Sequence, residues 1–174
     1  QTNRVLSVSG KADASSMTDM STEALVGHIP MLLHPRVENA LVIGLASGIT
    51  AGETLHYPLS RLDVLEISPE VVRACGAFTP WNNGVLSNPR TRLIIQDARA
   101  HLTLSEERYD VIVSEPSNPW MAGIANLFTL EFFQKVRAHL KPGGVFVQWF
   151  HTYETDWEAF AVAGRSLRTG FPNT

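Results

Sequence analysis

Short apolar runs alternate with longer segments along most of the chain. In the longer segments, apolar residues recur every three or four positions, which is typical of amphipathic helices. The apolar runs predict strands at residues 40–44, 61–67, 91–96, 109–114 and 145–150. The other segments predict helices at residues 48–56, 69–78, 98–104, 126–140 and 155–168. Lys141-Pro142-Gly143-Gly144 is expected to end the fourth of these helices. This alternation indicates βαβ units and therefore an α/β fold with a doubly wound, mostly parallel, Rossmann-like sheet.

Two elements precede the first strand. Residues 4–9 alternate between apolar and polar positions, which predicts a small β element before a turn at Gly10 and Lys11. Residues 21–34 have helical spacing, with Ser21 as the expected N-cap. The expected domains are an N-terminal β element, residues 1–20, and a Rossmann-like domain, residues 21–174.

Composition and charge narrow the range of functions. The chain has 174 residues, enough for one domain, and a net charge of −3 without a basic run, which argues against a nucleic-acid partner. The single cysteine, Cys75, excludes an internal disulfide and is expected to be a small buried hydrophobe. His28 and His34 lie on different faces of the predicted helix, and the other histidines are scattered, so we predict no metal site. We find neither a stretch of the length of a membrane span nor a signal peptide.

The first strand leads into a glycine-containing turn between Gly44 and Gly52. Glycine at a strand-to-helix turn lets the backbone approach a ligand closely, although any tight turn of this kind uses glycine. A dinucleotide fingerprint would need glycine at Ala46 and Ile49, and its absence argues against a nicotinamide cofactor.

Acidic residues follow the next two strands. Glu66 lies 22 residues after Gly44, near the distance at which an acid accepts from a ribose diol in nucleotide-binding folds. The alternative for Glu66 is a solvated acid that caps the helix at Pro69. Asp97 follows the third strand, where it can accept from the adenine amine, cap the next helix, or do both. Together these residues predict an adenosine site.

Glu115 follows the fourth strand, which in a doubly wound sheet lies beside the first. Since Pro116 and Pro119 stop the strand abruptly, this carboxylate is a candidate general base at the edge where ligands bind. The alternative is an acid held by backbone amides near Ser117. The following loop, residues 117–124, contains Trp120 and Met121 and is either a lid over the cofactor or ordinary packing.

Several runs resemble the spermidine/spermine synthase family, whose domain has the class I methyltransferase-like Rossmann fold. The resemblance covers nearly the whole chain, and the run from Glu115 to Gly123 is most similar to bacterial members fused to membrane-spanning segments. The motifs that carry it are the turn at 44–48, Leu65-Glu66-Ile67-Ser68-Pro69-Glu70, Gln96-Asp97-Ala98-Arg99, Tyr109-Asp110-Val111-Ile112, Ser117-Asn118-Pro119 and Asn126-Leu127-Phe128-Thr129-Leu130-Glu131-Phe132-Phe133.

The resemblance implies a transferase that moves the aminopropyl group of decarboxylated S-adenosylmethionine to a polyamine amine. It implies a cytoplasmic domain, tethered in the parent protein if membrane segments are present, and a homodimer, which is common in the family. Because such a sheet normally has two more strands, the C-terminal end of the domain is expected to be incomplete. Glu115 falls at the catalytic position, and Asn118 and Glu23 at substrate positions. The implied cofactor-binding residues are Gly44, Ser47, Gly48, Glu66, Ile67, Asp97 and Ala98.

The chain also departs from the family pattern. The family has aspartate at the positions of Ser47, Glu115 and Asn118, and tyrosine and glutamine at those of Thr22 and Glu23. Serine at position 47 weakens discrimination against the carboxylate of intact S-adenosylmethionine. Two alternatives therefore stay open: a methyltransferase that uses the intact cofactor, and a non-catalytic domain that binds an adenosyl ligand for a membrane protein.

Overall fold

The computed structural model describes residues 3–8, 10–117, 123–151 and 157–173. Five parallel strands form one sheet in the order β5-β4-β3-β6-β7, which confirms the doubly wound α/β prediction. The predicted neighbours also pair, because β6 lies beside β3 with Ala40 opposite Val111. The strands are β3 Asn39–Ile43, β4 Arg61–Glu66, β5 Thr91–Ile95, β6 Tyr109–Ser114 and β7 Leu140–Gln148.

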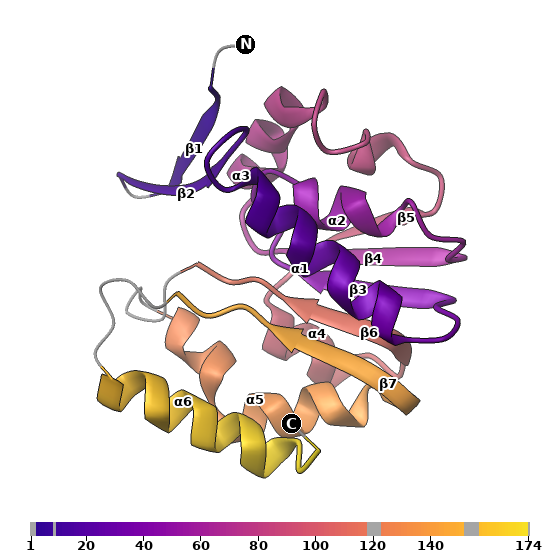
Figure 1. Ribbon diagram of the computed structural model, residues 1–174, viewed down its shortest axis with the longest axis vertical. Coiled ribbons are helices and arrows are strands. Elements are labelled where there is room, and N and C mark those ends of the chain that lie inside the picture. Colours follow the sequence, from indigo (N-terminus) through magenta and orange to yellow (C-terminus); the bar gives the residue numbers. More distant parts are fainter. Residues whose placement is uncertain (1–2, 9, 118–122, 152–156, 174) are drawn as a thin grey trace.

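Helices cover both faces of this sheet (Figure 1). One face is covered by α1 and α2, and the other by α4, α5 and α6. The helices are α1 Met20–Leu33, α2 Ile49–Thr54, α3 Pro69–Cys75, α4 Ala98–Leu104, α5 Leu130–Ala138 and α6 Trp157–Gly170. Three 3-10 helices connect them, η1 Gly76–Phe78, η2 Val85–Ser87 and η3 Ile124–Phe128.

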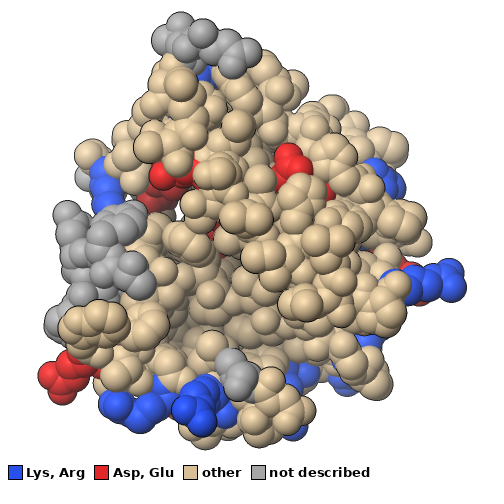
Figure 2. Space-filling model, in the orientation of Figure 1, with Lys and Arg blue, Asp and Glu red and all other residues tan. Residues whose placement is uncertain are grey.

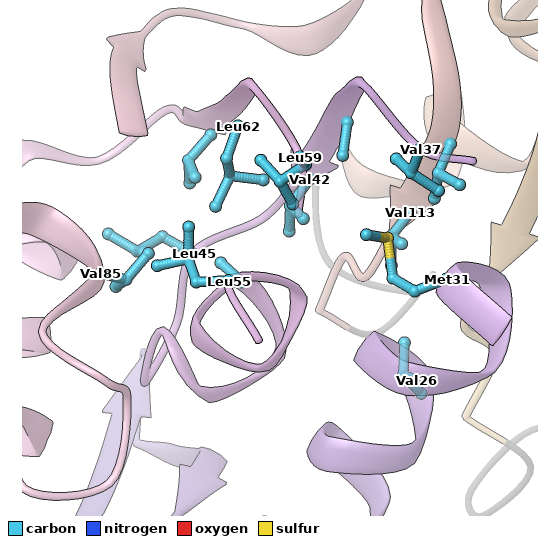
Figure 3. Packing of buried hydrophobic residues seen from close by; sticks show 14 of the residues in the cluster. Val26, Met31, Val37, Val42, Leu45, Leu55, Leu59, Leu62, Val85 and Val113 are labelled. Carbon is cyan, nitrogen blue, oxygen red and sulfur yellow. The ribbon is translucent and has the colours of Figure 1, made fainter. Parts of the chain in front are cut away.

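Alternate residues of the central strands form two separate cores. In β3, Val42 packs with the α1 and α2 side, whereas Leu41 and Ile43 pack with the side of α4 and α5. Figure 3 shows the first core, where Met31 from α1 and Leu55, the C-cap residue of α2, pack with residues of the sheet. Since strands buried on both faces cannot shift by one residue without exchanging the two cores, this packing fixes the register at the edge that carries the polar residues.

The N-terminal β element is a hairpin of β1 Val5–Val8 and β2 Lys11–Ser15. The second strand was not predicted, because its apolar positions are only alanines. The hairpin packs onto the α3 end of the domain through Leu6, Ala14 and Phe78. In Figure 1 it lies at the end toward which the arrows of β6 and β7 point.

The helix predicted at 126–140 is wrong in its bounds. Thr129 separates η3 from α5, and its side chain accepts from the Phe132 amide at 3.3 Å as the N-cap of α5. The run Lys141-Pro142-Gly143-Gly144 lies inside β7 instead of ending a helix. Lys141 pairs with the buried Asp110 at 2.9 Å, and an irregularity in the pairing with β6 accommodates the turn-forming residues at the sheet edge.

The structure corrects the predicted N-cap of helix α1 and confirms the prediction for Cys75. The N-cap of α1 is Asp19 and not Ser21, because the helix begins at Met20. Cys75 is fully buried, as predicted. No helix in the described part of the chain is long and apolar enough to cross a bilayer.

Candidate functional site

A cavity of about 360 Å³ lies at the carboxyl ends of the strands, at the edge that the sequence predicts. Residues that end or follow each of the five strands line it, and the hairpin supplies a further wall. The predicted residues that line it are Glu23, Gly44, Glu66, Ile67, Asp97, Ala98 and Glu115. Asn118 and the loop residues Trp120 and Met121 lie outside the described residues.

Gly44 lies where the turn after β3 meets the loop after β6. Its φ of 95° is in the left-handed region, and a Cβ at this position would collide with the backbone carbonyl of Glu115. Glycine therefore allows the turn after β3 to touch the loop after β6.

The structure places Ser47 and Gly48 behind the cavity wall and not in it. Gly48 precedes α2 with a φ of 80°, and a Cβ there would lie 2.8 Å from the Cys75 sulfur. The Ser47 carbonyl accepts from the Asn82 side-chain amide at 2.9 Å. Both residues thus support the turn from behind.

Glu66 is buried and held by backbone amides. Its Oε2 accepts from the Leu45 amide at 3.0 Å, and its Oε1 accepts from the Ser68 amide at 2.8 Å. It is therefore not the solvated cap of the alternative, since the Ser68 hydroxyl caps α3 by accepting from Val71. A carboxylate has about four acceptor sites, so Glu66 keeps capacity for hydroxyl groups in the cavity.

Asp97 caps α4, because its Oδ1 accepts from the Ala100 amide at 2.8 Å. It also lines the cavity, so capping and ligand binding are compatible. Ile67 and Ala98 line the wall beside it, and Ile67 is 67% exposed, unusually high for a large apolar side chain. This combination of an apolar surface and a polar acceptor fits a flat heterocycle.

Glu115 has a strongly perturbed carboxyl group. Burial, against the opposing effect of a hydrogen bond with Thr50 and together with the nearby carboxylates of Glu23 and Asp13, raises its pKa to about 8. A carboxyl group with this pKa is matched to proton transfer with amines near neutral pH.

Glu23 comes from α1 and reaches the same cavity. The Ser47 hydroxyl donates to its Oε2, and its Oε1 is buried without a hydrogen-bond partner among the described residues. Burial raises the pKa of Glu23 to about 7, and the Ser47 hydrogen bond opposes this shift. The cavity therefore contains a second carboxyl group that a cationic ligand would satisfy.

Sequence reasoning missed the hairpin residues and the residues after β7. Leu6, Val8 and Asp13 line the cavity although they lie far from the other site residues in the sequence. No pattern in the sequence indicates this docking. Trp149 and His151 also line the cavity, and the rule that ligands bind beyond strand ends would have found them.

The cavity is acidic. Its lining within the described part of the chain has five carboxyl groups and no Lys or Arg. Burial lowers the pKa of His151, so this lining residue is neutral near pH 7. In Figure 2, Lys and Arg lie mainly around the periphery of the face shown, and two acidic patches lie inside its upper half. The carboxyl groups belong to Asp13, Glu23, Glu66, Asp97 and Glu115. Near pH 7 the raised pKa values leave Glu115 mostly and Glu23 partly protonated, and a bound cation favours the ionised form of both, so this cavity suits a cationic ligand.

The described residues contain no group of His, Cys, Asp and Glu side chains that could hold a metal ion.

Comparison with known proteins identifies relatives of the whole domain. The family model described as the spermine/spermidine synthase domain matches residues 19–173. The chain is 30% identical to thermospermine synthase of Arabidopsis thaliana over 147 residues, which are 83% of this chain and 43% of that protein. It is 30% identical to a polyamine aminopropyltransferase of Clostridium perfringens over 151 residues, 85% of this chain and 53% of that protein.

Solved structures of spermidine synthases have a fold similar to that of this chain. A spermidine synthase in complex with the transition state analogue AdoDATO superimposes with a TM-score of 0.89 at 25% identity, covering 97% of this chain and 58% of that one. The Thermotoga maritima spermidine synthase gives a TM-score of 0.86 at 25% identity, covering 97% of this chain and 57% of that one. The chain thus spans about half the length of the relatives that it matches. On the family match and this fold, the chain belongs to the spermine/spermidine synthase domain family.

Proposed function

We propose that this domain transfers the aminopropyl group of decarboxylated S-adenosylmethionine to an amine of a polyamine. The observation that carries the proposal is the acidic cavity, which has five carboxyl groups and no Lys or Arg in its described lining. Both substrates are cations, one with a sulfonium and an ammonium group and the other with several ammonium groups. The complex of the related spermidine synthase with AdoDATO supports the same ligand chemistry.

The residues of the cavity divide into two roles under this proposal. Glu66 accepts from the ribose hydroxyls while the Leu45 and Ser68 amides hold its carboxylate in place. Asp97 accepts from the adenine amine, and Ile67 and Ala98 contact the ring. The turn at Gly44 brings this nucleoside half against the loop that carries Glu115.

Glu115 is the proposed general base. A neutral amine nitrogen attacks the methylene carbon next to the sulfonium, a nitrogen–carbon bond forms, and the carbon–sulfur bond breaks. The sulfur keeps the bonding electron pair, so methylthioadenosine leaves as a neutral thioether. Glu115 in its ionised form removes the proton that the substrate ammonium must lose before the attack. The bound cations favour this ionised form over the protonated form that a pKa of about 8 gives Glu115 in the empty cavity.

The proposal is tested by titrating the chain calorimetrically with decarboxylated and intact S-adenosylmethionine in parallel. We expect the decarboxylated form to bind more tightly, by about tenfold, because the carboxylate of the intact form would enter an acidic cavity. Tighter binding of the intact form would favour a methyltransferase. Binding of neither would contradict the cofactor assignment for this chain.

Glu115→Gln then separates an enzyme from a binding domain. We expect release of methylthioadenosine to fall by about 10² or more, while the decarboxylated cofactor still binds with affinity within a few-fold of the original. Glu106→Gln is the matched control, because Glu106 is exposed and precedes β6 at the opposite end of the sheet. Unchanged turnover in Glu115→Gln would refute the role of Glu115 as base.

The cytoplasmic location, the tether to membrane segments and the homodimer remain predictions that rest on the family resemblance. The proposed partner is a small-molecule amine.

A further inference from the structure

We propose that Asp13 of the N-terminal hairpin determines the choice of acceptor by binding a second ammonium group of a di- or polyamine. This inference rests on the proposed function and goes beyond it, because it assigns acceptor specificity to a residue outside the parallel sheet. Asp13 lines the cavity from β2, whereas the proposed base, Glu115, follows β6.

A direct contact places Asp13 on the Glu115 side of the cavity. The Ser117 hydroxyl donates a hydrogen bond to Oδ2 of Asp13. Ser117 lies two residues after Glu115 on the same loop. The hairpin carboxylate is therefore tied to the segment that holds the base, and its negative charge also contributes to the raised pKa of Glu115.

The other carboxyl groups of the cavity are held elsewhere. Glu66 and Asp97 accept from backbone amides at the ends of β4 and β5, on the far side of β3 from β6. Glu23 also acts on Glu115 through its charge, but its hydrogen bond is with Ser47, which belongs to the turn after β3. Asp13 is thus the carboxylate of the described lining, besides Glu115 itself, that is bonded to the loop after β6.

The charges around this end of the cavity suit a ligand with two cationic groups. No Lys or Arg belongs to the described lining. Lys11, two residues before Asp13 on β2, lies outside it, although its charge acts on His151, which lines the cavity. Glu115 receives the attacking amine, which must be neutral to react. Asp13 then meets the ammonium group at the other end of the molecule, and the apolar linker lies in the cavity between them.

This arrangement predicts discrimination by charge number. A diamine forms a charge-assisted hydrogen bond with Asp13 that a monoamine of the same length cannot form, which corresponds to about tenfold in affinity. The glycine turn and the nucleoside half of the site contribute equally to both acceptors, so the ratio of the two affinities isolates the hairpin.

The test is calorimetric titration of the full chain, saturated with methylthioadenosine, with 1,4-diaminobutane and with 1-aminobutane. We expect the original chain to prefer the diamine by about tenfold. Asp13→Asn, which keeps the shape and removes the charge, should abolish this preference and leave the monoamine affinity within about twofold. Ser117→Ala, which removes only the anchor, should reduce the preference by about threefold. Glu106→Gln removes the same charge from a distant surface and should change neither affinity.

Equal diamine preference in the original chain and in Asp13→Asn would overturn the inference, as would the absence of a preference in the original chain. Methylthioadenosine is titrated alone first, and turnover with decarboxylated S-adenosylmethionine is measured on the same samples. Lack of nucleoside binding or of turnover would count against the proposed function, whereas turnover with an unaltered acceptor preference in Asp13→Asn would count against Asp13 alone. Circular dichroism of each variant verifies that the fold is retained.

Discussion

At the scale of single residues, the site depends on carboxyl groups that differ in how they are stabilised. Glu66 accepts hydrogen bonds from two backbone amides, so its carboxyl group is held in place before any ligand binds. Glu115 has a hydrogen bond with Thr50, and Glu23 has hydrogen bonds with Ser47 and Ser15, but burial outweighs them and raises the two pKa values to about 8 and about 7. The fixed carboxylate suits a permanent hydrogen-bond acceptor, and the perturbed pair suits proton transfer and cation binding.

The two raised pKa values predict how stability depends on pH. The ordinary pKa of both groups is 4.5, so the folded chain holds these protons more tightly than the unfolded chain does. Their contribution to stability is complete below pH 4.5 and is lost as the pH rises through about 7 and about 8. We therefore expect the thermal unfolding midpoint of the ligand-free chain to decrease as the pH rises from about 5.5 to about 8.5.

Glu23→Gln and Glu115→Gln should each flatten this dependence, because an amide does not titrate in this range. Calorimetric melting of the three proteins in matched buffers measures it. A slope that is identical in all three would mean that other groups govern the pH dependence.

At the scale of elements, the strands of the sheet differ in how many neighbouring strands they pair with and in how deeply they are buried. The central strands β3 and β6 pair on both sides, and most of their residues are buried. The strand β7 pairs only with β6 in the described structure, and none of its residues is fully buried. It ends at Gln148, and Trp149 and His151 after it line the cavity, so the stability of this edge bears directly on the site.

Hydrogen exchange should reveal this difference. We expect amides of β7 to exchange at least about tenfold faster than those of β3 and β6, because edge backbone groups open without global unfolding. Exchange resolved by nuclear magnetic resonance or by peptide mass spectrometry is the measurement. Protection in β7 equal to that in the central strands would show that this edge is covered.

At the scale of the whole molecule, acidic and basic residues occupy different regions, which the net charge of −3 does not reveal. The five carboxyl groups gather in one cavity, whose described lining has no Lys or Arg, while Figure 2 shows basic residues around the periphery of one face. A cavity lined by one sign of charge concentrates ligands of the other sign. Under the proposed function, this cavity draws in the cationic acceptor although the domain is close to neutral overall.

Salt should weaken binding of the amine more than binding of the nucleoside. We expect affinity for 1,4-diaminobutane to fall severalfold between about 50 mM and about 500 mM salt, because the Debye length shortens across this range. Affinity for methylthioadenosine, a neutral ligand, should change by less than about twofold. Parallel titrations measure both, and equal salt dependence would argue against a charge-based acceptor site.

The amino-acid sequence by itself determined the parallel sheet and the edge at which the site lies. Strands and helices of distinct periodicity leave few alternatives to βαβ units, and acids at strand ends necessarily meet at one edge. For this reason Glu66, Asp97 and Glu115 could be predicted as site residues from local pattern alone. The match between this edge and the cavity supports that reasoning.

Only the tertiary structure decided which faces are buried and which distant residues enter the site. The helical spacing of residues 21–34 rested on Leu25, Val26, Ile29, Leu32 and Leu33. Of these only Val26 is buried, whereas the other four are exposed, and the helix buries the face that also carries Met31. Periodicity determines that a helix has an apolar face, whereas packing partners determine which side is covered. Asp13 likewise reaches the cavity only because the hairpin docks there, since contacts between residues 104 positions apart leave no local pattern.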